Sequence, residues 1–148
     1  MRIVVCDEAG LLRESVEALI EQVGHELVGV ADTSALGVQL VQVAKPDAVV
    51  YDMTVGINSD FDLIAEAQEL GTTVVVFSYN TDAALLDRYP VRPTVVHKPD
   101  LGVLESVLRR LDVDARRGVV AAERRQRPTR QLTAPEPTGV VDAAAFYE

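Results

Sequence analysis

Polar residues able to bind a metal ion or a phosphoryl group lie at the ends of short apolar runs in this sequence. They are Asp7 and Glu8 after 3–6, Asp52 after 48–51, Ser78 after 74–77 and Lys98 after 94–97. Three carboxylates held close together repel one another unless a cation compensates them. Mg²⁺, a hard ion that takes carboxylate, water and phosphate oxygens, is the expected cation.

If these residues meet, their types suit phosphoryl chemistry. Asp52 can act as the nucleophile, Lys98 and the metal can neutralise the phosphoryl oxygens, and Ser78 can donate a hydrogen bond. Each residue alone has a plainer interpretation. Asp7, Asp52 or Ser78 can be a helix cap, Glu8 a first-turn acid and Lys98 a solvated lysine. Asp7, Asp52, Ser78 and Lys98 each directly follow a different apolar run, and this common position favours a phosphoryl-binding site over separate plain roles.

The apolar runs predict five β-strands. Three of them, 3–6, 48–51 and 74–77, are continuous and rich in β-branched residues, which indicates burial on both faces. The runs at 27–31 and 94–97 are weaker and suit outer strands. Helical spacing of apolar residues at 11–23, 36–44 and 63–70 separates these runs.

Start and stop signals support these helices. Thr33-Ser34 and Asp60 are expected to begin helices, whereas Gly24, Pro46 and Gly71 are expected to end them. Strands that alternate with helices predict a doubly wound, five-stranded parallel sheet in a three-layer α/β sandwich. Ligands bind such sheets at the carboxyl ends of the strands, near the reversal of strand order. That edge is where the polar residues fall.

Composition limits the function classes. The chain has 148 residues, 48% apolar and 25% charged, and a single cysteine, Cys6, so a disulfide-stapled class is excluded. No apolar run is long enough to span a membrane, and we expect a soluble, cytoplasmic protein. The formal charge of −9 argues against generic binding to nucleic acid or to an anionic membrane.

Charge divides the chain into two parts. Residues 1–100 hold six basic and sixteen acidic residues, whereas 101–148 hold eight basic and seven acidic ones. We predict a domain over 1–112 and a tail over 113–148, Arg-rich first and then Pro-rich. Residues 114–125 can prolong the last helix, and 126–139 has a disordered composition. The tail is interpreted as a solvated arm, or alternatively as a basic segment that docks on an acidic surface.

Four motifs, in order and at family spacing, resemble the receiver domain of two-component response regulators. They are Ile3-Val4-Val5-Cys6-Asp7-Glu8, the segment 45–52 ending in Asp52, the segment 74–78 ending in Ser78, and Lys98-Pro99. The opening is similar to receivers of the helix-turn-helix transcription-factor subgroup. The resemblance implies a flavodoxin-like (CheY-like) fold, and the residues after 112 are too few for that subgroup's output domain, so no direct DNA binding is expected.

The resemblance also implies roles for the residues. Asp52 would accept a phosphoryl group from a sensor histidine kinase or a phosphotransfer protein. Asp7, Glu8, Asp52 and the backbone carbonyl of Thr54 would hold Mg²⁺. Ser78 and Lys98 would contact the phosphoryl oxygens, and Lys98-Pro99 would be a cis peptide. Such a stand-alone receiver signals through a downstream protein or a second copy of itself, and it is not an enzyme acting on an external substrate.

Three positions depart from the family pattern. Glu8 stands where an aspartate is usual, Val95 replaces the switch aromatic, and Gly56 replaces a proline. A pseudo-receiver that is an interaction module without phosphorylation therefore stays an alternative. A haloacid-dehalogenase-like phosphatase is disfavoured by the order of its motifs. In that class a second Asp lies two residues after the nucleophile, where this chain has Thr54.

Overall fold

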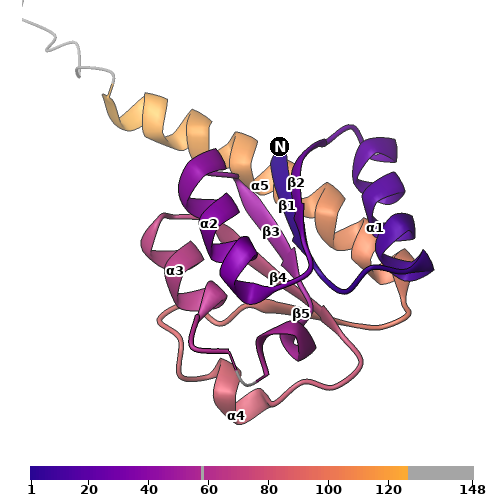
Figure 1. Cartoon of the computed structure of the whole chain (residues 1–148). Coiled ribbons are helices and arrows are strands. Elements are labelled where there is room, and N and C mark those ends of the chain that lie inside the picture. The colour runs from indigo at the N-terminus through magenta and orange to yellow at the C-terminus, as the bar shows by residue number, and fades with distance from the viewer. Residues whose placement is uncertain (58, 127–148) are drawn as a thin grey trace, which may run out of the picture. The chain divides into compact units, whose positions relative to one another are not determined.

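Five parallel strands form one sheet in the order β2-β1-β3-β4-β5 (Figure 1). The computed structural model describes residues 1–57 and 59–126, with only the backbone helix given for 115–126. One compact unit comprises Met1–Val113. The strands are β1 (Arg2–Cys6), β2 (Glu26–Ala31), β3 (Ala48–Tyr51), β4 (Thr73–Ser78) and β5 (Thr94–His97). The predicted doubly wound sheet is confirmed, with the two weaker runs as its outer strands.

Helices cover both faces of the sheet. They are α1 (Leu11–Gln22), α2 (Ser34–Ala44), α3 (Leu63–Glu69), α4 (Ala83–Leu86) and α5 (Leu101–Gln126), with a 3₁₀ turn η1 (Met53–Gly56) after β3. One apolar cluster joins the sheet to α1 and α5, and a second joins it to α2, α3 and α4. The sheet is therefore the middle layer of three.

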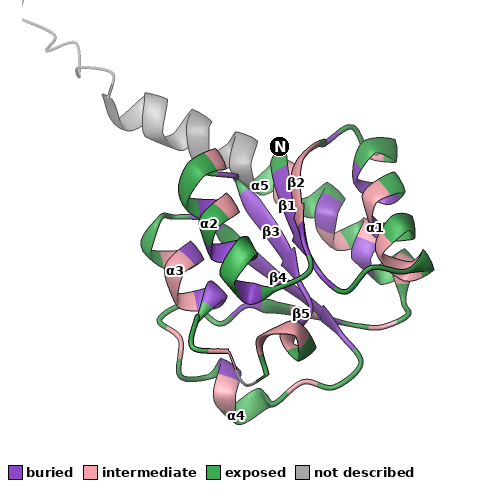
Figure 2. Ribbon diagram, in the orientation of Figure 1, coloured by how far each residue is buried: buried purple, intermediate pink, exposed green. Residues whose placement is uncertain are grey.

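Alternate residues of each inner strand belong to opposite clusters. In β1, Ile3 and Val5 pack with α1 and α5, whereas Val4 and Cys6 pack with α2 and α3. All four are at most 1% exposed. Figure 2 shows the central strands coloured as buried. Burial on both faces explains why the inner strands read as continuous apolar runs.

Helix boundaries follow the local signals with one correction. The Thr33 hydroxyl accepts a hydrogen bond from Leu36 N at 3.2 Å and caps α2 as predicted. The prediction of Asp60 as a cap is wrong, because Asp62 caps α3 by accepting from Ala65 N at 3.1 Å. The cap therefore falls directly before Leu63, the first residue of the helix, which is buried.

The helix α5 continues to Gln126, through the segment for which the sequence predicts a helical extension. The Pro-rich segment predicted to be disordered lies outside the described residues, apart from its first position. In the part of the chain that the structure describes, no helix is both long enough and apolar enough to cross a membrane.

Candidate functional site

The strand order reverses between β1 and β3, and two aspartates lie at this reversal. Cys6 of β1 and Tyr51 of β3 are paired in register, so Asp7 and Asp52 follow at the same edge of the sheet. Backbone bonds continue the sheet past its last pairs: Asp7 N donates to Ala31 O and Asp52 N donates to Cys6 O, both at 2.9 Å. This is the edge at which doubly wound sheets bind ligands.

Lys98 joins the two carboxylates. Its Nζ lies 2.7 Å from Asp7 Oδ2 and 2.7 Å from Asp52 Oδ2, and the paired side chains are only 6% and 7% exposed. Backbone contact holds the lysine at the edge, since Lys98 N donates to Ser78 O at 3.0 Å. The peptide bond to Pro99 is cis, as the resemblance implied. We call Asp7, Asp52, Ser78 and Lys98 the Asp52 cluster.

The other oxygen of Asp52 is also hydrogen-bonded. Ser78 Oγ and Thr54 Oγ1 each donate to Asp52 Oδ1 at 2.7 Å, and Thr54 N donates to the same atom at 3.0 Å. Ser78 and Lys98 therefore hold opposite oxygens of one buried carboxylate. This places one nucleophilic side chain between a hydroxyl and an ammonium group.

The two aspartates differ in their acidity. Burial by itself would raise the pKa of Asp52, but hydrogen bonds from Lys98, Ser78 and Thr54 outweigh it and lower that pKa to about 2. Burial raises the pKa of Asp7, and the hydrogen bond from Lys98 only partly offsets that effect. Asp52 is consequently ionised at neutral pH, and the carboxylate is the form that acts as a nucleophile.

Glu8 does not join the two aspartates. Its side chain is exposed in the loop between β1 and α1, and its backbone N donates to Asp7 Oδ1 at 2.7 Å. Among the described residues, no group of three or more His, Cys, Asp or Glu side chains is arranged to hold a metal ion. The carbonyl of Thr54 accepts from Ile57 N at 3.3 Å within the 3₁₀ turn. The sequence thus expected three carboxylates where the structure gathers two.

Two buried carboxylates still suit Mg²⁺, which commonly takes one or two protein carboxylates and completes its shell with water and phosphate. Both groups are hard oxygen donors on one edge of the sheet. The residues present therefore fit a magnesium ion held by Asp7 and Asp52, without a third carboxylate from Glu8.

Several contacts of the site were not foreseen from the sequence. Thr54 was expected to contribute only its carbonyl, yet its hydroxyl and N–H both bind Asp52. The spacing of two residues after an aspartate is a usual signal for such a turn. Ser78 was expected to contact a phosphoryl oxygen, and its hydroxyl lies 2.7 Å from Asp52 Oδ1 and 3.1 Å from Asn80 O, so these two acceptors share its one proton.

The departures from the family pattern have local explanations. Val95 is half-buried and packs against the apolar cluster of α2 and α3. At Gly56, a Cβ atom would overlap the hydroxyl of Tyr51, which is hydrogen-bonded to Ser34 Oγ at 3.1 Å. The close approach of η1 to this tyrosine requires glycine at that position.

Known proteins similar to the chain support the same fold. No protein-family model matches it. It is 24% identical over 140 residues to the transcriptional regulatory protein PdtaR of Mycobacterium tuberculosis, covering 88% of this chain and 68% of PdtaR. It is also similar to the receiver domain of the response regulator NarL of M. tuberculosis, with a TM-score of 0.62 and 23% identity, covering 79% of this chain and 96% of that one.

A further solved structure agrees with this comparison. The receiver domain of AraT, a response regulator of Geobacillus stearothermophilus, has a TM-score of 0.68 and 18% identity, and 79% of this chain and 96% of that one are covered. The chain has the fold of response regulator receiver domains. The predicted flavodoxin-like class is therefore confirmed.

Proposed function

We propose that this chain is a response regulator receiver that accepts a phosphoryl group on Asp52. The observation that carries the proposal is the arrangement of one buried carboxylate at the strand-order reversal, with Ser78 and Lys98 each 2.7 Å from one of its oxygens. Similarity to a regulatory protein and to receiver domains supports the same class. A sensor histidine kinase or a phosphotransfer protein is the expected donor.

In this mechanism an oxygen of the Asp52 carboxylate attacks the phosphorus of a phosphohistidine. The new O–P bond forms as the N–P bond breaks, and the imidazole leaves with the electron pair and takes a proton from solvent. Lys98 compensates the negative charge of the phosphoryl oxygens, and Ser78 donates a hydrogen bond to one of them. Asp7 and Asp52 would hold Mg²⁺, which supplies positive charge to the transferring group when bound.

The phosphoryl group changes the charge and the hydrogen bonds at Asp52. It adds negative charge and acceptor oxygens where Lys98 and Ser78 now bind the carboxylate. Ser78 ends β4 and Lys98 directly follows β5, so a change in their contacts alters the surface around the ends of these two strands. We propose that the chain signals in this way, by altered binding to another protein, and does not turn over an external substrate.

Acetyl phosphate with Mg²⁺ provides a direct test, with incorporation followed by intact mass. We expect labelling of the wild type and its loss, by about 100-fold or more, in Asp52→Asn, because nucleophilic residues contribute effects of this size or larger. Asp32→Asn is the matched control, since Asp32 is an exposed aspartate directly after β2 at the same edge. Labelling of Asp52→Asn at the wild-type level would contradict the assignment.

A pseudo-receiver is the second candidate function, and one observation favours it. The side chain of Glu8 is exposed, and among the described residues no third carboxylate joins Asp7 and Asp52. Beryllofluoride with Mg²⁺ separates the two candidates. A receiver binds it and shifts the amide signals of Asp52, Ser78 and Lys98, whereas a pseudo-receiver shows neither these shifts nor labelling by acetyl phosphate.

A further inference from the structure

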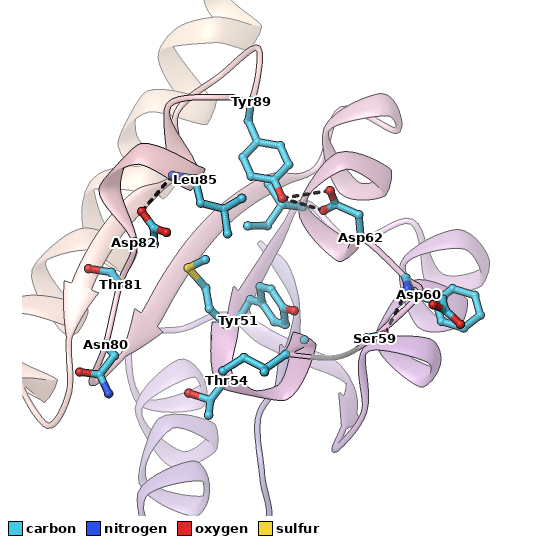
Figure 3. A pocket seen from close by; sticks show the side chains of 15 residues that line it. Tyr51, Thr54, Ser59, Asp60, Asp62, Asn80, Thr81, Asp82, Leu85 and Tyr89 are labelled. Atoms are coloured by element: carbon cyan, nitrogen blue, oxygen red, sulfur yellow. Dashed lines mark hydrogen bonds between the residues drawn. The ribbon is translucent and has the colours of Figure 1, made fainter.

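A cavity of about 590 Å³ lies next to η1, on the α3 and α4 side of the sheet. Three chain segments line it: the end of β3 with η1, the loop into α3, and the chain from Asn80 to Tyr89 that includes α4. Figure 3 shows labelled side chains from all three segments around this space. We call it the acidic cavity.

The cavity combines an apolar lining with uncompensated negative charge. Tyr51, Met53, Ile64 and Leu85 provide apolar surface, whereas Asp60, Asp62 and Asp82 are exposed carboxylates among its lining residues. No lining residue is basic, and none of the three aspartates forms a salt bridge within the described part of the chain.

The acidic side chains are held in place by the fold. Asp62 and Asp82 cap α3 and α4 through Oδ1, and Tyr89 Oη donates to both carboxylate oxygens of Asp62 at 3.0 Å. Burial and the bonded Asp62 carboxylate raise the pKa of Tyr89 to about 12, so its phenol is a protonated donor at neutral pH. These bonds fix the positions of the Asp62 and Asp82 carboxylates, and neither of the two forms a salt bridge with another described residue.

We propose that the acidic cavity is a binding site for a small organic cation, an amine or amidine attached to an aromatic or aliphatic body. The body would contact the apolar lining, and the cationic end would face the carboxylate of Asp62, in the negative field of Asp82 on the other side of Leu85 and Tyr89 (Figure 3). The volume lies within the range of about 300 to 1,000 Å³ typical of small-molecule sites, which usually combine an apolar lining with a few polar groups. A small molecule of this size can contact residues of all three lining segments.

Two residues that line the cavity also bind members of the Asp52 cluster. Thr54 lines the cavity and donates to Asp52, and Asn80 lines it and accepts from Ser78 through its carbonyl. A ligand in the cavity would therefore touch residues that bind Asp52 and Ser78. The binding site itself does not depend on phosphorylation, so it can be tested on the unphosphorylated protein without Mg²⁺.

Three probes with one aromatic body and different charges test the proposal. They are tryptamine, a cation; tryptophol, a neutral alcohol; and indole-3-acetate, an anion. Titrations of the full chain are followed by amide NMR signals. We expect tryptamine to bind about fivefold more tightly than tryptophol, which is at the upper end of the effect of one exposed charge pair, and indole-3-acetate to bind most weakly. The signals of Thr54, Phe61 and residues 80–85 should shift.

Variants locate the binding. Asp62→Asn with Asp82→Asn removes two charges while keeping side chains that cap helices well, and we expect tryptamine affinity to fall about fivefold. Glu21→Gln with Glu69→Gln removes two exposed charges outside the cavity and should change affinity by less than about twofold. Leu85→Trp should fill the cavity and abolish binding of all three probes, with dispersed amide signals showing that the fold is intact.

The proposal is overturned if the three probes bind equally, if the shifted signals lie elsewhere, or if the Asp62 and Asp82 double variant binds tryptamine as the wild type does. These outcomes differ from failure of the phosphorylation test, which uses acetyl phosphate and a separate variant. Each proposal can therefore fail without the other.

Discussion

The Asp52 cluster and the acidic cavity are two negatively charged regions, and they handle their charge differently. In the cluster, two carboxylates that are 7% exposed or less share one ammonium at 2.7 Å. In the cavity, three exposed carboxylates belong to a lining that includes no basic residue in the part of the chain that the structure describes. Burial makes the first arrangement necessary, because unpaired buried charges are costly, whereas water stabilises the second.

This difference suggests how each region uses a cation. The cluster contains its own, Lys98, which holds Asp52 ionised and aligned before any reaction. The described lining of the cavity contains none, and we propose that its negative charge is available to a ligand. Mutations should therefore change stability in the cluster and ligand affinity in the cavity.

Lys98→Met is expected to give the largest effect on stability. Methionine keeps much of the length but removes the charge, which leaves two buried carboxylates facing each other. Loss of one partner of a buried ion pair costs about 3 kcal/mol or more, and we expect the free energy of unfolding at neutral pH to fall by about this amount in urea titrations.

Arg92→Met is the matched control for this loss. Its ion pair with Asp87 is 3.3 Å long and both side chains are more than half exposed. Such exposed pairs contribute less than about 1 kcal/mol. Equal losses in the two variants would mean that burial does not distinguish the cluster.

The pH dependence of unfolding should separate the two aspartates of the cluster. The pKa of folded Asp52 is about 2, below the value of about 3.9 in an unfolded chain. Its stabilisation, about 2 kcal/mol, is therefore present above about pH 5 and is lost as the pH falls toward the folded pKa. The pKa of Asp7 is raised, so its contribution has the opposite sign and weakens folding as the pH rises.

Urea titrations without divalent ions, at several pH values between about 3 and 7, measure these terms. Asp52→Asn should flatten the fall of stability in acid, and Asp7→Asn should steepen it. The same change of slope in both variants would show that the two carboxylates do not differ in acidity as described.

Gly56→Ala tests the close approach of η1 to Tyr51, two features of the cavity lining. The added Cβ would overlap the Tyr51 hydroxyl, next to Asp52 in sequence and in the cavity lining. Overpacking of this kind costs about 2 kcal/mol, and combining the change with Tyr51→Phe should recover part of the loss. Gly102→Ala on α5 is the control, with both variants compared in thermal unfolding. An added Cβ there would lie 3.6 Å from Asp100 Oδ1, an ordinary contact, and alanine favours a helix over glycine, so this variant should be neutral or stabilising.

The smallest effect on stability is expected in the cavity. Asp62→Asn with Asp82→Asn removes exposed charges and keeps both helix caps, so the free energy of unfolding should change by less than about 1 kcal/mol. Urea titration beside Lys98→Met provides the comparison. A loss as large as that of the lysine variant would contradict the distinction between the two regions.

The sheet and the edge that carries the polar residues could be predicted from the sequence. Continuous β-branched runs such as 74–77 indicated burial on both faces, and strands that alternate with helices indicated parallel pairing. The polar residue after each run then placed Asp7, Asp52, Ser78 and Lys98 at one edge. The cap of α3 was misplaced at Asp60. Aspartates stand at both 60 and 62, and the local sequence does not distinguish which of them begins the helix.

The acidic cavity was not predicted, and its residues explain why. Asp62, Asp82 and Tyr89 are separated along the chain and have no shared motif, and two of them look like ordinary helix caps. All three line one cavity because the loop into α3 and the chain through the short α4 both lie beside η1. Side-chain packing of this kind has no periodic signal.

The sequence by itself determined where strands and helices alternate along the chain, because apolar periodicity and helix-ending residues are local properties. It also determined which polar residues reach the binding edge, since parallel strands end on the same side of the sheet. Only the tertiary structure decided that Lys98 pairs with Asp7 and Asp52 while Glu8 stays exposed. Distances between side chains from different strands depend on packing and burial, which neighbouring residues in the chain do not specify.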